Sequence, residues 1–123
     1  MALPQRDTIP ESLHARKFFR DSDVSGVNSA LTLSTEVGLL RRIISVDVVY
    51  SGSATANVDI TVNSGLGAGY DNLRQTIALS GARYAFWVPD EEVLLWPDDV
   101  LDVLTGAGGA GVTSTVVIET EAV

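Results

Sequence analysis

The chain contains no cysteine and only one histidine, His14. The missing thiols exclude a disulfide framework, a thiolate metal site and a cysteine nucleophile. A single histidine excludes a metal site built on several imidazoles, and no nucleophile motif accompanies it, so a Ser-His-Asp triad is not expected. No apolar run approaches the ~20 residues that a membrane-spanning helix needs. We therefore expect no enzyme, no bound metal or other cofactor, and no membrane partner.

Basic residues are also scarce, with 8 Lys and Arg against 16 Asp and Glu and a formal net charge of −8. Residues 26–123 contain no lysine, and their four arginines face twelve acidic residues. Because phosphate contacts need clustered Lys and Arg, we expect no nucleic-acid partner. The 123 residues are 46% hydrophobic and 20% charged, which is typical of one folded domain with its own core.

The first 25 residues differ from the rest in composition. Their four basic and four acidic residues cancel, and Pro4 and Pro10 disfavour early regular structure. The spacing of apolar residues fits a short helix over 11–19. We therefore predict two parts, an extended or partly helical N-terminal arm (1–25) and a folded domain (26–123).

The arm has only two large apolar side chains, the adjacent Phe18 and Phe19. One interpretation is that they pack back on the domain of the same chain. The second is that they anchor the arm on a neighbouring subunit, assisted by the basic residues around them, and the third is that the arm is disordered. The second interpretation makes Arg16, Lys17, Phe18, Phe19 and Arg20 candidate partner-binding residues.

The domain reads as a succession of β-strands. Residues 42–50 and 54–63 alternate apolar and polar side chains, and the Ser51-Gly52-Ser53 turn between them predicts an antiparallel hairpin. Further strands are predicted at 30–35, 73–79, 84–88, 93–96, 100–104 and 112–121. In the segment 84–88 we expect Tyr84, Phe86 and Val88 to point inward and Trp87 to point to the opposite face.

Seven or eight short strands at this spacing predict an all-β fold, an antiparallel β-sandwich. No helical period separates the strands, which argues against a parallel α/β sheet. A count of eight slightly favours a jelly roll over an immunoglobulin-like topology, although the sequence by itself does not separate the two.

Two loop features superficially suggest ligand sites. The glycine-rich runs at 65–69 and 106–111 lack the following helix and lysine of a phosphate loop, so we expect flexible hairpin loops there. The acidic residues at 90–92 and 98–99 match no calcium-loop pattern. A solvated acidic rim is the preferred interpretation, with a surface Ca²⁺ as the alternative.

The two tryptophans are the remaining candidates for a contact. Trp87 is out of phase with its neighbours, and Trp96 stands at a strand end before Pro97. Since tryptophan is enriched at the centres of protein interfaces, we predict subunit contacts for both. A sugar-stacking platform shared with Tyr70, or burial in the core of the domain, are the alternatives.

The C-terminal half of the chain resembles a known class of proteins. The aromatic segment from Tyr84 to Asp90, the segment Leu94–Val103 and the glycine-rich turn into 113–121 are together similar to structural β-sandwiches of tailed-bacteriophage virions. The resemblance covers roughly residues 40–123.

This resemblance implies a non-enzymatic capsid decoration, or cement, protein located in the virion and assembled in the host cytoplasm. Its partners would be the major capsid protein or other virion proteins. It would also form a homo-oligomer, with a trimer favoured. A neck or tail accessory protein and a carbohydrate-binding β-sandwich module are the alternative functions.

Overall fold

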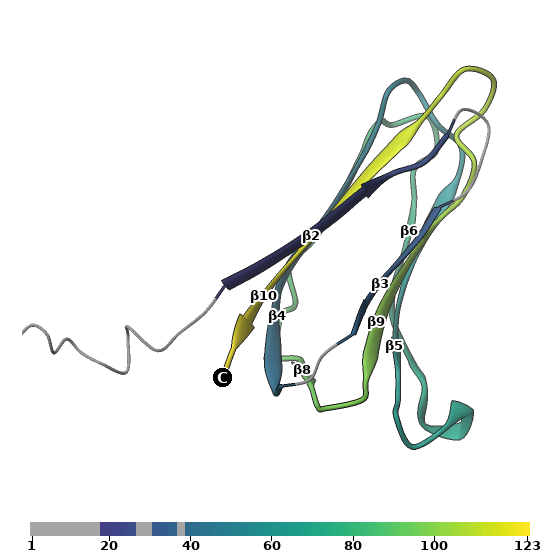
Figure 1. Ribbon diagram of the computed structural model, residues 1–123. Helices are drawn as coiled ribbons and strands as arrows, with labels where there is room; N and C mark the ends of the chain where they lie inside the picture. Colours follow the sequence, from purple (N-terminus) through teal and green to yellow (C-terminus); the bar gives the residue numbers. More distant parts are fainter. Residues whose placement is uncertain (1–17, 27–30, 37–38) are drawn as a thin grey trace, which may run out of the picture.

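The computed structural model describes residues 18–26, 31–36 and 39–123, and it is an all-β protein (Figure 1). The described residues form nine strands and one short 3-10 turn, η1 (Ala68–Tyr70). The strands are β2 (Phe18–Val24), β3 (Leu31–Glu36), β4 (Arg41–Tyr50), β5 (Asn57–Asn63), β6 (Asn72–Ala78), β7 (Tyr84–Trp87), β8 (Leu94–Leu95), β9 (Val100–Thr105) and β10 (Ser114–Ala122). None of these described elements is a helix that could cross a membrane.

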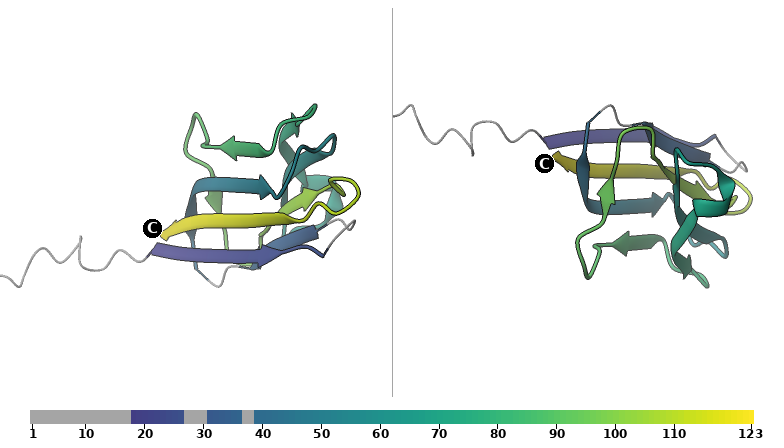
Figure 2. Two further views of the ribbon diagram at one scale, coloured as in Figure 1. Left: turned by 90° about the horizontal axis from the view of Figure 1, so that it is seen from above. Right: turned by 90° about the horizontal axis from the view of Figure 1, so that it is seen from below.

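The strands form two antiparallel sheets. The first sheet has the order β2-β10-β4-β7, with β8 also paired to β4, and Figure 2 shows β2, β10 and β4 side by side. The second sheet has the order β3-β9-β5-β6. If the two-residue strand β8 is set aside, this is the strand order of a jelly roll, in which the chain crosses repeatedly between the sheets. The predicted antiparallel, jelly-roll-like sandwich is therefore confirmed.

The core lies between the sheets and is built from alternate residues of the central strands. In β4 the inward side chains are Val46, Val48 and Tyr50, and all three are buried. The other central strands contribute in the same alternating way, through Val58, Ile60, Leu101, Val103, Val116 and Ile118. This alternation explains why the period-two pattern located most strands correctly.

The predicted hairpin between residues 42–50 and 54–63 is wrong. β4 pairs with β10 and β7 in the first sheet, whereas β5 pairs with β9 and β6 in the second. The segment that connects β4 to β5 is hydrogen-bonded to the loop before β7, where the amide of Ala54 donates to the carbonyl of Ala82 at 3.1 Å. Two amphipathic strands can bury their apolar sides against each other across a core as well as within one sheet, so the pattern does not separate the two arrangements.

The folded domain begins earlier than composition predicted. Phe18–Val24 is an edge strand that pairs with β10 along its length, and Ser25 is buried with its amide bonded to the carbonyl of Ser114 at 2.8 Å. The boundary at residue 25 is therefore wrong, as is a helix that includes Phe18 and Phe19. The rest of the predicted helix lies outside the described residues. An edge strand rich in charged residues has the composition of a loop, which explains the error.

The predicted orientation of side chains in β7 is also reversed. Ala85 pairs with Val48 and is buried, and Trp87 pairs with Val46 and packs against the core. Tyr84 and Phe86 therefore point outward. Because every residue of this short strand is apolar, hydrophobicity does not mark its inner face, and the neighbouring strand decides.

Candidate functional site

The outer face of the first sheet, the side turned away from the second sheet, carries the candidate site. Residues paired across strands point to the same side, so the register arranges outward residues in rows. The first row is Val24, Thr115, Val49 and Tyr84, and the second is Ser22, Val117, Asp47 and Phe86. We call these two rows the aromatic face.

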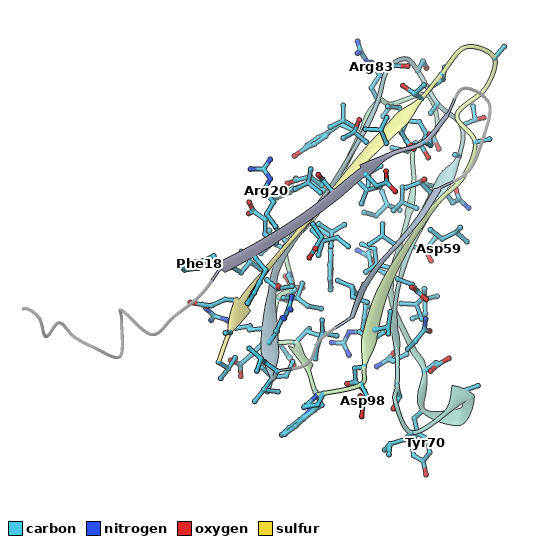
Figure 3. The ribbon with its side chains drawn as sticks, in the orientation of Figure 1. Phe18, Arg20, Asp59, Tyr70, Arg83 and Asp98 are labelled. Carbon is cyan, nitrogen blue, oxygen red and sulfur yellow. The ribbon has the colours of Figure 1, made fainter. Side chains whose placement is uncertain are left out.

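The aromatic face carries several accessible apolar side chains among polar ones. Tyr84 and Phe86 are 54% and 51% exposed, Val49 beside Tyr84 is also exposed, and so is Val24 at the β2 edge of the same row. Single exposed apolar residues are ordinary, but a contiguous set on two neighbouring strands, as formed by Val49, Tyr84 and Phe86, is typical of a contact surface. Figure 3 shows side chains standing on this side of the sheet, with Arg20 directed away from the second sheet.

Two interactions hold the aromatic pair in place. The rings of Tyr84 and Phe86 are stacked, with centroids 6.1 Å apart and an interplanar angle of 15°. The Tyr84 hydroxyl donates to Oδ1 of Asp47 at 2.9 Å. This hydrogen bond to a carboxylate, followed by desolvation and the charge of Asp47, raises the pKa of Tyr84. The pair therefore presents a fixed shape, which lowers the entropy lost when a partner binds.

The other end of the same outer face is charged and nearly balanced. Arg20 lies 3.9 Å from Glu119, and Arg42 forms an ion pair with Glu121, whose side chain is buried. The row that contains this second pair begins with Phe18, which is 69% exposed. Positive and negative groups therefore alternate here within a few ångströms.

The outer face of the second sheet has a different character. Its outward positions include Asp59, which accepts a hydrogen bond from Thr76 at 2.8 Å, and Asp102, which accepts one from Asn63. Leu104 is an exposed apolar residue of this face, at 45%. Since acidic and amide groups dominate here, the aromatic face is the stronger candidate for contact with another protein.

The structure divides the candidate arm residues. Arg16 and Lys17 lie outside the described residues. Phe18 and Arg20 project from the outer face of the first sheet, next to the aromatic face. Phe19 is turned the other way, pairs with buried Thr120 and lies over the guanidinium of Arg41, 3.8 Å from the ring centroid. Phe19 thus contacts its own chain, whereas Phe18 is largely exposed, so the two phenylalanines do not behave alike.

The two tryptophans do not share a site. Trp87 packs against the core and lines a hollow of about 280 Å³ near Arg74 and Pro89. Trp96 is exposed and lines another hollow of about 410 Å³ with Leu66 and Pro97. Tyr70 is exposed and does not line that hollow.

The turn that carries Trp96 is held by several hydrogen bonds. Pro97 and Asp98 occupy its centre, Asp98 has a φ of 74°, and the amide of Asp99 bonds to the carbonyl of Trp96 at 3.0 Å. The Asp99 carboxylate accepts the amides of Trp96 and Gly65 at 3.1 and 3.0 Å. At least this part of the predicted acidic rim therefore has a structural role. Among the described residues, no group of three or more His, Cys, Asp or Glu could hold a metal ion.

Replacing Asp98 with glycine is expected to stabilise the protein by ~0.5–1 kcal/mol, because glycine adopts a positive φ without steric cost. Urea unfolding followed by circular dichroism measures this change. Asp90→Gly, in another exposed turn whose φ is not positive, serves as the matched control and should not stabilise. A loss of stability in Asp98→Gly would show that the carboxylate makes a needed contact.

The aromatic face offers apolar area, a fixed aromatic pair and flanking ion pairs, which suit binding of a protein surface better than chemistry on a small substrate. Sequence reasoning missed Tyr84 and Phe86 as contact residues because it placed them in the core. The only feature of the sequence that could have indicated their outward orientation is Ala85, the one small side chain in the strand. No protein family, curated protein or solved structure was found to match the chain.

Proposed function

We propose that this protein is a non-enzymatic structural component of a virus particle, a capsid decoration protein that binds other virion proteins through the aromatic face. The observation that carries this proposal is that Val49, Tyr84 and Phe86 are exposed side by side on one sheet of the sandwich. Such a surface is costly to leave in water unless a partner covers it. Tyrosine is among the residues enriched at the few positions that carry most of the binding energy of a protein interface.

The strand order is consistent with this function but does not establish it. Jelly rolls build viral capsid proteins, and they also build lectins and cupins. Function must therefore be argued from the site. The aromatic face favours a protein partner, whereas a lectin would need a groove that combines aromatic and polar groups.

The distribution of charge along the chain supports a contact near the start of β2. From Phe18 onward the chain has five basic residues and fourteen acidic ones, whereas residues 1–17 have three basic and two acidic. Arg16 and Lys17 directly precede Phe18, the first residue of β2, which lies at the charged end of the outer face of the first sheet. In this proposal they bring positive charge to an acidic capsid surface, which acts over about a Debye length of ~8 Å.

The test uses virus particles released by cells that carry the gene. Particles are purified on a density gradient and probed with an antibody against this protein. We expect the protein to sediment with the particles, to resist washing and to be present in many copies per particle. Its recovery only in the soluble fraction, with none on the particles, would reject the proposed function.

A further inference from the structure

The hollow beside Trp96 is lined by aromatic and polar groups from two loops. Residues 64–66, between β5 and η1, form one wall, and residues 96–99, between β8 and β9, form the other. Its volume of about 410 Å³ falls within the ~300–1,000 Å³ of small-molecule sites. Trp96 and Leu66 are 59% and 78% exposed, so a ligand can reach both side chains from solvent.

This hollow is separate from the aromatic face. In Figure 3, Asp98 of the hollow lies at one end of the sandwich, together with Tyr70, whereas Arg83 lies at the other end. Arg83 directly precedes Tyr84 of the aromatic face. The two surfaces share no residue, so a contact through the aromatic face uses none of the groups in the hollow.

Hydrogen bonds join the two loops that form the hollow. The carboxylate of Asp99 accepts the amide of Trp96 in its own turn and the amide of Gly65 in the other loop, at 3.1 and 3.0 Å. Gly65 also packs closely on Asp98, since a Cβ atom at position 65 would lie 2.7 Å from the Cβ atom of Asp98. The backbone of the hollow is thus in place before a ligand arrives, which lowers the entropy lost on binding.

Asp98 holds an unfavourable backbone conformation in this hollow. Its φ of 74° lies in the left-handed region, which glycine adopts without steric cost. Its carboxylate makes no hydrogen bond or ion pair within the part of the chain that the structure describes. Residues with strained backbone cluster at ligand sites. A ligand that binds the carboxylate would explain an aspartate at a position that suits glycine better.

The side chains of the hollow fit the two kinds of surface on a sugar ring. A pyranose has C–H groups on one face, which can stack on an indole such as that of Trp96, and hydroxyls around its edge. The Asp98 carboxylate can accept hydrogen bonds from such hydroxyls. The Ser64 hydroxyl already accepts the amide of Leu66 at 3.0 Å, so its own proton is available for a sugar oxygen.

The charge of the hollow disfavours other classes of small ligand. None of its lining residues is basic, so it lacks the Arg or Lys that usually binds phosphate or sulfate, and Asp98 and Asp99 repel an anion. An ammonium ion would suit Trp96 and Asp98. It has no acceptor, however, for the hydroxyl of Ser64.

We propose that this hollow binds an uncharged saccharide, whose ring stacks on Trp96 and whose hydroxyls bond to Asp98 and Ser64. The inference goes beyond the proposed function and does not depend on it. If the protein is present in many copies on one particle, those copies multiply a weak affinity for a saccharide surface.

The first experiment titrates the isotopically labelled full chain with maltose, cellobiose, lactose and di-N-acetylchitobiose and follows the indole N–H signals by NMR. The signal of Trp96 is identified by its loss in Trp96→Phe. We expect at least one disaccharide to shift this signal saturably, with a dissociation constant of ~1 mM or lower, and to leave the signal of Trp87 in place. No saturable shift with any of the four, or binding of choline chloride in their place, would overturn the proposal.

The second experiment measures the affinity of variants for that disaccharide by isothermal titration calorimetry. Trp96→Ala should raise the dissociation constant about tenfold or more, because the stacking surface is lost. Tyr70→Ala is the matched control and should leave the constant unchanged, since Tyr70 is 67% exposed at the same end of the molecule but does not line the hollow. Unchanged affinity in Trp96→Ala, or an equal loss in Tyr70→Ala, would overturn the assignment to the hollow.

Asp98→Gly separates loss of a ligand contact from loss of the fold. It should raise the dissociation constant about fivefold, because a hydrogen bond to a carboxylate is removed, while the variant stays folded. Circular dichroism of the same sample checks the fold. A folded Asp98→Gly variant with wild-type affinity would overturn the role of the carboxylate.

Discussion

A chain carrying Phe86→Asp is expected to fold as the wild type does and to be nearly absent from purified particles. Phe86 is about half exposed, so its replacement leaves no cavity in the core. At the centre of an interface, however, a buried carboxylate with no partner costs at least ~2 kcal/mol, which lowers affinity about 30-fold or more. Quantitative immunoblotting of gradient-purified particles measures the copies that remain bound.

Leu104→Asp supplies the control for this prediction. Leu104 is 45% exposed against 51% for Phe86, and it lies in a strand of the second sheet. The same charge is therefore introduced at a similar exposure on the opposite outer face. Circular dichroism confirms that both variants are folded. Equal particle binding by the two variants would show that the aromatic face is not the contact.

Tyr50→Ala is expected to lower the free energy of unfolding by ~3–5 kcal/mol, a large share of the ~5–15 kcal/mol typical of a domain. Tyr50 is 1% exposed, and its hydroxyl donates to the carbonyl of Gly106 at 2.6 Å. The ring also packs on Gly108, where a Cβ atom would lie 2.7 Å from the ring. Urea unfolding followed by tryptophan fluorescence measures the loss.

Tyr50→Phe separates the ring from the hydroxyl and should lower the free energy of unfolding by only ~1 kcal/mol. Burial raises the pKa of Tyr50 above its ordinary 10.0, although a hydrogen bond with Thr105 acts in the opposite direction. Because the pKa of Tyr50 is higher in the folded state than in the unfolded state, this tyrosine adds stability that is fully present below pH 10. That contribution is lost as the pH rises through the raised pKa of the folded state. Tyr50→Phe should therefore lose less stability than the wild type as the pH rises above 10. Part of the loss should remain in this variant, because the pKa of Tyr84 is also raised. An unchanged alkaline fall would contradict this role for Tyr50.

The loop that receives Tyr50 shows where composition misleads. The glycine run at 106–111 predicted a flexible hairpin loop, but it connects β9 of the second sheet to β10 of the first, and these two strands do not pair with each other. Gly108 is nevertheless buried, and both Gly106 and Gly108 lack room for a Cβ atom. These glycines permit close packing on Tyr50 and Ala56. A glycine that allows close approach and one that allows motion look alike in a sequence.

The amino-acid sequence by itself determined the fold class and most strand positions. Period-two alternation in 42–50, 54–63 and 112–121 is a local property, since it depends only on which residues of one strand share a side. The strand end at Trp96 was equally local, because the proline that follows cannot donate a ladder hydrogen bond. These features need no knowledge of any other segment.

Tertiary structure alone decided which sheet each strand joins, which side of β7 is buried and where the folded domain begins. β4 and β5 lie in different sheets, Ala85 rather than Phe86 faces the core, and Phe18–Val24 is held by β10. The hydrogen-bond partners of a strand come from residues far along the chain, and alternation is the same whichever partner is chosen. The aromatic face depends on all three decisions, so it became visible only in the folded protein.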